Sequence, residues 1–583
     1  PGVTLTQAQL SMKALGAHLE QEYPTANAGR NCDLVPIDQT IVPPAQRRNF
    51  VLAGTLMMCV VGLVLLIACA NVANLLLARA TRRGTEMAIR LSLGASRARL
   101  IRQLLTESLV LGLSSALLGI LTASWARQLV IGLIPGGLPR NLDTSLDIRV
   151  LAFTVGIAIA ATVLFGLIPA LQASKAEQMT SLRDRGDVAG GTPRWYGLRG
   201  LLVVLQVALS LIALVGAGLF IHSLLNAQEM DPGFETKHEM VMPLNLAAQR
   251  YPQERAEQFW RDAIDRLRAN PLIAGAAVSD AAPFGGSFQR TTFPEGVDVK
   301  DPRNGKLTPT LSVSPGFFST AGITLLRGRD FDDHDTAQSP MVAVVNEAFL
   351  ARTWPGQNPL GKHLHFTLVD WNVEVVGVVK TVKYVTLGEP PQPIVYFPLK
   401  QHYSPGVTLY VRTHGDPAGA VASIRSTVQS LDAALPLQNL RLVRDVLDRA
   451  LVAPRLGAEL LGVFGILALV LAAIGTYGVM SYSVSQRTHE IGVRMALGAR
   501  PGHVLRLILG NGMSMVLAGV VAGMALSSLL ARSMNSLLYG IGAFDAPAFL
   551  LTAALLAIVA LFACWLPARR GMRVDPMIAL RYE

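Results

Sequence analysis

One segment of this 583-residue chain has the spacing of a phosphate-binding loop. Gly356, Gly361 and Lys362 stand where such a loop places its two glycines and its lysine, so that backbone N–H groups surround a phosphate. The next residue, His363, replaces the serine or threonine that would meet Mg²⁺. The segment therefore predicts a turn rather than a nucleotide site.

Other catalytic patterns are missing from the sequence. It contains no His-Glu-x-x-His zinc motif and no Gly-x-Ser-x-Gly nucleophile elbow. His363 and His365 alternate with apolar residues and predict the polar face of a strand rather than metal ligands. We therefore expect no catalytic residue, no metal and no cofactor in this chain, and no ATP hydrolysis by the chain itself.

A basic segment that occurs twice in the sequence indicates a binding surface for a partner protein rather than a catalytic site. The first copy covers residues 83–95 and the second covers 487–499, with Glu86 matching Glu490 at a separation of 404 positions. A second pair of segments, which begins at Pro169 and at Pro567 with a separation of 398 positions, repeats in the same order. The matched segments indicate an internal duplication.

Each copy of the basic segment reads as a short amphipathic helix that a glycine ends. Glutamate precedes arginine by four residues in both copies, a pair worth a few tenths of a kcal/mol. A single helix of this kind is typical of a connector that rests on lipid headgroups, but its repetition favours two equivalent contacts with a two-fold partner. The candidate docking residues are Glu86, Ile89, Arg90, Gly94, Ala95, Glu490, Val493, Arg494, Gly498 and Ala499.

The two basic segments lie between long stretches that contain no charged residue, and these stretches would form the helices that hold the segments in place. Each is close to or above the roughly 20 residues that a helix needs to cross a bilayer, and buried helices of soluble proteins seldom stay uncharged for so long. We predict seven membrane spans, at 50–78, 108–126, 150–174, 200–228, 461–486, 507–531 and 546–568.

The spans hold neutral polar residues but no charged ones. An ion-coupled transporter would be expected to place ionisable side chains inside its spans. The amides are instead predicted to hydrogen-bond between helices rather than to bind a substrate. They are Asn71, Asn74, Gln206 and Asn511.

Composition and charge placement give the orientation of the spans. Charged residues make up 16% of the chain and hydrophobic ones 51%, with a net charge of +11, which is typical of a membrane protein. Arginines are dense in alternate loops, around 79–102, 183–199, 487–506 and 569–581, and short basic loops stay in the cytoplasm. The basic excess therefore reflects topology and not nucleic-acid binding.

The same alternation places the long segment from Glu229 to Glu459 outside the cytoplasm. It mixes strand-like alternation with helix-like segments, which predicts an α+β domain. The expected strands are 239–246, 341–346, 373–380 and 408–412, and the expected helices are 253–269 and 418–431.

These residues resemble the MacB/FtsX-like ABC transporter permeases. The Glu-x-x-x-Arg-x-x-x-Gly-Ala segment and the Pro-Ala ends of the halves are similar to those of the permease region. The segments 313–318, 326–331 and 358–362 resemble the MacB-type periplasmic domain. Two permease halves in one chain are similar to the duplicated orphan permeases.

The resemblance implies a polytopic α-helical membrane protein with a large extracytoplasmic α+β domain and two FtsX-like halves. In the family each half has one span, one domain and three further spans, so we expect an N-terminal portion before Pro1. The expected parts are residues 1–49, the end of a first extracytoplasmic domain; 50–174, the first permease half; 175–199, a cytoplasmic linker; 200–228, a span; 229–460, the MacB-like domain; and 461–583, the second half.

The resemblance also implies partners and a location. A cytoplasmic ABC ATPase dimer would dock on the two basic segments of a permease in a bacterial-type plasma membrane, with an extracytoplasmic or outer-membrane export partner as a further expectation. Mechanotransmission to the extracytoplasmic domain, in the service of export, is the favoured function. An FtsX-like regulator of a cell-wall hydrolase is the alternative, and an enzyme with its site in the extracytoplasmic domain ranks last.

Overall fold

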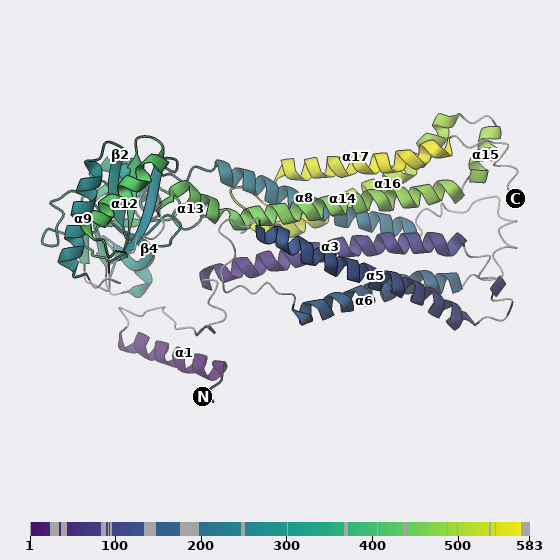
Figure 1. The fold of residues 1–583 in the computed structure, drawn as a ribbon, viewed down its shortest axis with the longest axis horizontal. Coiled ribbons are helices and arrows are strands. Elements are labelled where there is room, and N and C mark those ends of the chain that lie inside the picture. Colours follow the sequence, from purple (N-terminus) through teal and green to yellow (C-terminus); the bar gives the residue numbers. More distant parts are fainter. Residues whose placement is uncertain are drawn as a thin grey trace. The chain divides into compact units, whose positions relative to one another are not determined.

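The computed structural model describes residues 2–23, 34–36, 44–82, 89–90, 93, 96–132, 147–174, 198–246, 251–299, 301–366, 371–404, 406–435, 440–486, 488–497, 500–535, 538–542 and 544–572. They form two compact units (Figure 1). One unit, Pro1–Ala45 with Ala227–Val452, contains a mixed domain of strands and helices, called here the sheet domain. The other, Gln46–Asn226 with Ala453–Glu583, is a helix bundle.

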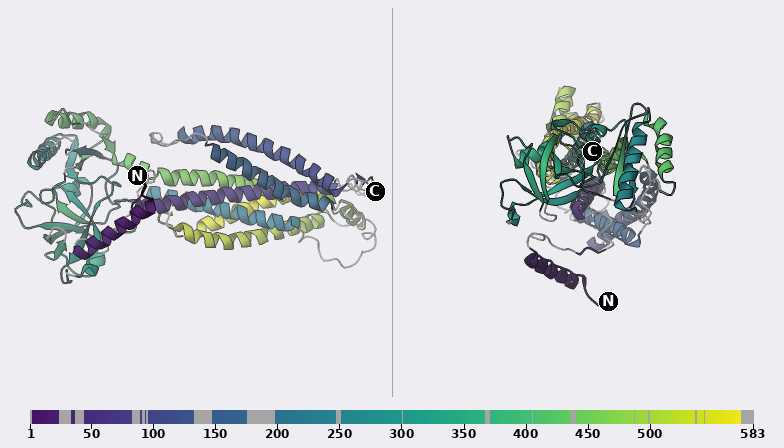
Figure 2. Two further views of the ribbon diagram at one scale, coloured as in Figure 1. Left: turned by 90° about the horizontal axis from the view of Figure 1, so that it is seen from below. Right: turned by 90° about the vertical axis from the view of Figure 1, so that its left-hand side faces the viewer.

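The sheet domain is built on one sheet of eleven strands, which Figure 2 shows from two further sides. The strand order is β11-β1-β10-β2-β4-β3-β7-β8-β6-β9, and β5 pairs with β8. Because β9 pairs with β4 as well as with β6, six strands from β4 to β9 along this order close into a ring. In chain order the strands are β1 (Glu239–Asn245), β2 (Ile273–Ser279), β3 (Phe288–Pro294), β4 (Lys306–Val313), β5 (Leu325–Gly328), β6 (Val342–Asn346), β7 (His363–Phe366), β8 (Trp371–Val379), β9 (Val395–Pro398), β10 (Gly406–Thr413) and β11 (Arg441–Leu442).

In the strands of the ring, alternate side chains lie on opposite faces of the sheet and therefore pack into different apolar clusters. On β6, Ala343 and Val345 join one apolar cluster with residues of β7, β8 and β9, whereas Val342 and Val344 join another. Successive side chains of a strand point to opposite faces. The nearly uninterrupted run of apolar residues in β6 is therefore explained by burial on both faces.

Helices cover the remaining strands. The buried face of α9 (Gln253–Arg268) includes Ala256, Trp260, Ala263 and Leu267, at the spacing of helical turns. With α12 (Val421–Leu431), these residues pack on apolar side chains of β1, β2 and β10. The other helices of this unit are α1 (Leu5–Glu22), α10 (Phe317–Thr320), α11 (Glu347–Thr353) and α13 (Val443–Ala450), with 3₁₀ turns at Pro302–Asn304 and Pro417–Ala420.

The structure confirms the predicted α+β fold. The four expected strands lie in β1, β6, β8 and β10, and the two expected helices are α9 and the 3₁₀ turn with α12. The segment with phosphate-loop spacing is a turn, in which Gly356 and Gly361 adopt positive φ angles of 72° and 81°. His363 and His365 share the half-buried face of β7, while Leu364 is buried.

The helix bundle contains the predicted spans. Six described helices are long and apolar enough to cross a membrane. The remaining predicted span, 150–174, lies in α6, where the apolar stretch among the described side chains is only Ile148–Leu164, so this span stays a prediction. The bundle helices are α3 (Pro44–Arg82), α5 (Arg97–Gly132), α6 (Ile148–Ser174), α8 (Leu198–Glu229), α14 (Val452–Gln486), α15 (Thr488–Ala496), α16 (Pro501–Met534) and α17 (Ala546–Gly571).

The internal duplication extends to helix packing. In the first half, Ser108 of α5 faces Gly166 of α6, and a Cβ on Gly166 would lie 3.3 Å from Ser108 Cβ. Their repeat equivalents are Gly512 of α16 and Cys564 of α17, at separations of 404 and 398 positions. A Cβ on Gly512 would lie 2.8 Å from Cys564 Sγ. The same contact therefore occurs in both halves. The glycine is on the second helix of the pair in the first half, α6, and on the first helix of the pair in the second half, α16.

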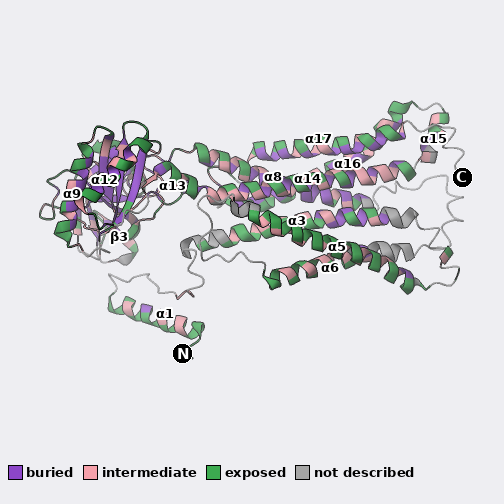
Figure 3. Ribbon diagram, viewed as in Figure 1, coloured by how far each residue is buried: buried purple, intermediate pink, exposed green. Residues whose placement is uncertain are grey.

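Helix α8 is the most buried of the six candidate spans (Figure 3). Small residues allow its neighbours to approach it closely. A Cβ on Gly519 of α16 would lie 2.7 Å from the Val207 side chain, and one on Gly218 of α8 would lie 3.1 Å from Thr552 of α17. The chain leaves this helix at Glu229 and continues into the sheet domain.

Candidate coupling segments and polar junction

The second basic segment forms helix α15, between α14 and α16. Ile491 is buried and packs with Val484, Ile508 and Ala568 of the three neighbouring long helices. One turn further along the helix Arg494 is exposed, and Val493 is half-buried. An amphipathic helix at this site is thus confirmed, anchored to the bundle by its apolar side. The Glu490 side chain, Gly498 and Ala499 lie outside the described residues.

Only part of the first basic segment is described. Ile89 and Arg90 are helical, and Ile89 is 54% exposed. Arg90 Nη1 donates a hydrogen bond of 3.3 Å to Gln103 Oε1 of α5. Glu86, Gly94 and Ala95 lie outside the described residues. The arginine of the repeat therefore ties this segment to the helix that follows it.

Two leucines that sequence reasoning did not select stand out in these segments. Leu93 is 82% exposed and Leu497 is 83% exposed, the highest values among the large hydrophobic residues described. They are repeat equivalents, 404 positions apart. Figure 1 places α15 and the start of α5 at the same end of the bundle. An apolar residue that directly precedes the terminal glycine in both copies was the available sequence signal.

A polar junction lies inside the bundle where α3, α8 and α14 meet. Asn71 Nδ2 and Gln206 Nε2 donate hydrogen bonds of 2.8 and 2.7 Å to the same acceptor, Leu471 O. Ser210 Oγ of α8 donates a bond of 3.2 Å to Ala468 O. The predicted role of Asn71 and Gln206 in linking helices is therefore confirmed.

Gly475 makes room for this junction. A Cβ on Gly475 would lie 2.1 Å from Asn71 Oδ1 and 2.4 Å from Gln206 Oε1, far inside contact distance. Any side chain there would move both amides away from Leu471 O. In a membrane no water replaces such lost hydrogen bonds, so glycine is required at this position.

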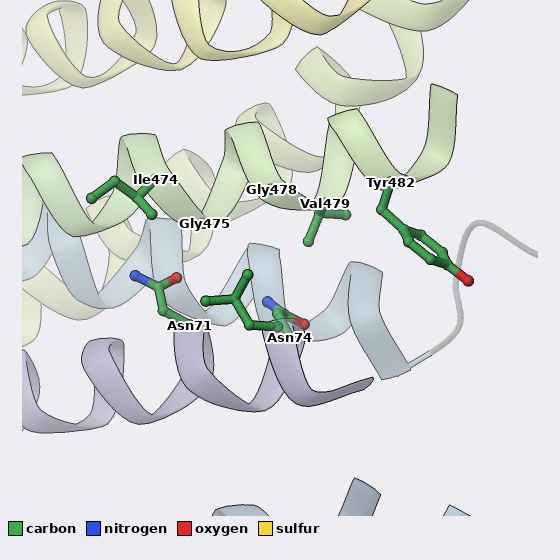
Figure 4. Close-up of a pocket in the computed structure, with 8 residues that line it drawn as sticks. Asn71, Asn74, Ile474, Gly475, Gly478, Val479 and Tyr482 are labelled. Atoms are coloured by element: carbon green, nitrogen blue, oxygen red, sulfur yellow. The ribbon is translucent and has the colours of Figure 1, made fainter. Parts of the chain in front are cut away.

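Asn74 of α3 lines a cavity together with Gly478 of α14 (Figure 4). It is only 6% exposed, and neither amide atom has a hydrogen-bond partner within the described part of the chain. The adjoining cavity measures about 30 Å³, which is room for about one water molecule. The cavity is too small for a transported solute. The interhelical bonds predicted for Asn74 and Asn511 are not seen among the described residues.

A second junction fastens the end of α8 that enters the sheet domain. Ser223 Oγ accepts a hydrogen bond of 2.7 Å from Tyr539 N, and Asn226 Nδ2 donates one of 3.0 Å to Tyr539 O. His222 Nδ1 lies 2.8 Å from Asp545 Oδ2, and Asp545 also caps α17. The last two turns of α8 are therefore held against the connection between α16 and α17.

A Ser–His contact in the sheet domain has a structural explanation. Arg290 Nη2 contacts His402 Nε2, and because a guanidinium can only donate, Nε2 must accept. His402 Nδ1 therefore carries the proton and donates it to Ser312 Oγ at 2.6 Å. Ser312 is 1% exposed and bonds to Asp280. A histidine that donates to the serine is not its base, so these four residues form a half-buried hydrogen-bond network.

This network gives the sheet domain opposing responses to acid. Burial raises the pKa of Asp280 to about 6, and burial together with Arg290 lowers the pKa of His402 to about 4. The stability from Asp280 is complete below its ordinary pKa of 3.8 and is lost as pH rises through 6. The stability from His402 is complete above 6.5 and is lost as pH falls through 4. Between pH 4 and 6.5 the two contributions oppose each other.

We therefore expect that replacing one of the two groups will leave the pH dependence of stability that the other group causes. Asp280→Asn should make the sheet domain lose stability more steeply than the wild type between pH 6.5 and 5. His402→Gln should make it gain stability over the same interval. Urea unfolding of residues 232–449 at several pH values measures both slopes, with Asp298→Asn, at an exposed aspartate, as control. Equal slopes in all four proteins would contradict this assignment.

Comparison with known families matches two kinds of domain. The FtsX-like permease C-terminal domain matches residues 58–178 and again 462–576. The MacB-like periplasmic core domain matches residues 201–427. The two FtsX-like regions and the MacB-type domain expected from the sequence are thus confirmed.

Individual proteins match over part of the chain. The macrolide export ATP-binding/permease protein MacB of Azoarcus sp. (strain BH72) is 28% identical over 279 residues, or 44% of this chain and 40% of that protein. The protein of the same name from Neisseria meningitidis serogroup A / serotype 4A is 23% identical over 300 residues, or 48% and 45%. The chain thus spans less than half the length of these curated relatives. The crystal structure of the periplasmic region of MacB from Actinobacillus actinomycetemcomitans covers 38% of this chain and 94% of its own, at 16% identity and a TM-score of 0.26.

Proposed function

Since this chain is a MacB/FtsX-like ABC transporter permease, we propose that it couples a separate cytoplasmic ATPase dimer to movements of the sheet domain. The observation that carries the proposal is the pair of matched, strongly exposed leucines, Leu93 and Leu497. A connector resting on lipid needs only amphipathic character. Two equivalent exposed leucine side chains would fit the two equivalent grooves of a two-fold symmetric ATPase. That partner would hydrolyse the ATP.

Helices α8 and α14 give the proposal a mechanical path. The sheet domain is inserted between them, since the chain leaves α8 at Glu229 and re-enters the bundle at Val452. Helix α14 has 35 residues and is therefore about 50 Å long, at roughly 1.5 Å per residue. It runs from the sheet domain to the coupling helix α15. Movement of α15 therefore reaches the sheet domain along one continuous helix.

The polar junction makes α8 and α14 move together. Gln206 and Ser210 of α8 both bond to backbone oxygens of α14, and the far end of α8 is held by Tyr539 and Asp545. A displacement of α14 would therefore be shared with α8, α16 and α17. Both connections to the sheet domain would then shift, which is what transmission of work across a membrane requires.

The arginine asymmetry supports the orientation. It supports a cytoplasmic location for the coupling segments and an extracytoplasmic one for the sheet domain, and the family resemblance favours a bacterial-type plasma membrane. Export is the purpose we propose, because the sheet domain would then act on an extracytoplasmic partner without a solute passing through the bundle. The cavity at Asn74 is consistent with this, since it admits about one water molecule.

Charge reversal tests the coupling segments. We expect Glu86→Lys with Glu490→Lys to weaken recovery of a tagged ATPase on the detergent-solubilised chain, because the two glutamates hold matching positions in the repeated basic segments. The control is Glu254→Lys, which reverses an exposed glutamate of α9 in the sheet domain. Proteins are compared at equal membrane levels. Wild-type recovery and wild-type ATP turnover in the double variant would defeat the coupling role of these segments.

A further inference from the structure

A groove runs along the start of helix α5, where α6 packs beside it (Figure 1). Its volume is about 370 Å³, within the range of sites that hold small ligands. Six of the described residues that line it recur every three or four positions along α5 and therefore share one face of that helix. With one residue of α6, the lining is Ala98, Ile101, Arg102, Leu105, Thr106, Leu109 and Val163.

The groove has an apolar lining and a single cation. Five of the lining residues are apolar, and Arg102 and Thr106 are the polar ones. The Thr106 hydroxyl donates a hydrogen bond of 2.7 Å to Arg102 O, so it is satisfied within the helix. The Arg102 guanidinium is exposed, and it has no ion pair or hydrogen bond within the described part of the chain. It is therefore available to an anionic ligand.

The groove crosses from a basic to an uncharged part of α5. Residues 96–106 include three arginines and no acidic residue, whereas residues 108–126 carry no charge at all. From Ala98 to Leu109 the groove is about 16 Å long, at roughly 1.5 Å per residue. One end would therefore lie among lipid headgroups, which attract arginine when they are anionic, and the other would reach the hydrocarbon.

The second half shows where a further bundle helix would pack. At a separation of 404 positions, Arg102 corresponds to Arg506 of α16, which is also exposed. The close contacts of α8 with α16 lie farther along, where a Cβ on Gly519 or Gly523 would come within 3.0 Å of α8 atoms. A helix that packed on α5 as α8 packs on α16 would therefore leave the arginine end of the groove open.

We propose that this groove binds a phospholipid with an anionic headgroup. One acyl chain lies along Ile101, Leu105 and Val163, and the phosphate accepts hydrogen bonds from the Arg102 guanidinium. Arginine suits this role because its planar fork of N–H donors matches phosphate oxygens. A zwitterionic headgroup carries its own cation, so the groove prefers the anionic lipid. The site does not depend on an ATPase partner.

Photo-crosslinking of the full chain in lipid vesicles tests the site. The probe is a phosphatidylglycerol with a diazirine in one acyl chain, added in trace amount to phosphatidylcholine vesicles, and mass spectrometry maps its attachment. We expect attachment within residues 98–109 and at Val163. Arg102→Gln should lower this yield about five-fold, the effect of one arginine near an anionic headgroup. Arg149→Gln, at an exposed arginine near the start of α6, is the control and should keep the yield.

A second variant separates the groove from surface charge. Thr106→Trp keeps the arginine but fills the middle of the groove, so it should lower attachment of phosphatidylglycerol and of a matching phosphatidylcholine probe. Wild-type attachment in Thr106→Trp would overturn the proposal. Equal attachment of the two probes to the wild type, unchanged in Arg102→Gln, would indicate unspecific lipid contact and overturn it too. Labelling of other faces of the chain without labelling of the groove would show that another segment covers it, with the same consequence.

Discussion

The variant Gly328→Ala is expected to lower the melting temperature of the sheet domain by roughly 4–20 °C. Gly328 ends β5, pairs with Gly377 of β8 and has a φ angle of 76°. A Cβ there would lie 2.1 Å from Val376 O and 2.9 Å from Gly377 Cα. These are backbone atoms that cannot turn aside as a side chain would, so β5 must separate from β8.

The size of this effect follows from two costs. The left-handed backbone costs an alanine about 1–2 kcal/mol, and overpacking against fixed atoms adds about 1–3 kcal/mol or more. For a domain of this size each kcal/mol lowers the melting temperature by roughly 2–4 °C. Thermal melting of residues 232–449 measures the shift. This fragment contains three of the apolar clusters and is expected to melt cooperatively.

Gly356→Ala is the matched control for backbone strain. Gly356 has a similar φ angle of 72°, but a Cβ there would meet nothing within 4 Å. We expect only the backbone cost, a decrease of about 2–8 °C at about 1–2 kcal/mol. Equal shifts for the two variants would show that β5 yields to the added methyl group, and would contradict the close approach of β5 and β8.

The largest functional effect is expected from Leu93→Asp with Leu497→Asp. Burial of one leucine side chain in a partner stabilises a complex by about 1.5–3 kcal/mol, so loss of both should weaken ATPase binding about 100-fold to 10,000-fold. Each single variant should lose about the square root of that factor if the two contacts are equivalent. Binding of the purified ATPase to the chain in nanodiscs measures the affinities.

Two controls separate docking from lipid contact. Leu307→Asp changes another exposed leucine, in β4 of the sheet domain, and should leave binding unchanged. Leu93→Met with Leu497→Met keeps apolar projections of similar length and should retain binding within a few-fold. If the double aspartate variant binds the ATPase as the wild type does, the leucines rest on the membrane surface and the coupling proposal loses its main support.

Local sequence patterns were sufficient for the long helices of the bundle, and for four of the eleven described strands and two helices of the sheet domain. Uncharged stretches mark the bundle helices, because a helix that crosses hydrocarbon cannot carry charges at low cost. Alternation marks β1, β8 and β10, because one face of each strand is buried more deeply than the other. Repetition marks the two halves without any structure, since matched segments at 83–95 and 487–499 stand in the sequence itself.

Contacts between distant residues were decided only by the tertiary structure. Nothing near Gly475 in sequence indicates that Asn71 and Gln206 need its missing side chain, and nothing near β4 indicates its parallel pairing with β9. Such contacts depend on how helices and strands pack, which local patterns do not encode. The exposure of Leu93 and Leu497 belongs to the same class: their sequence neighbours suggest a buried apolar face, and only the surrounding helices determine that both side chains face outward.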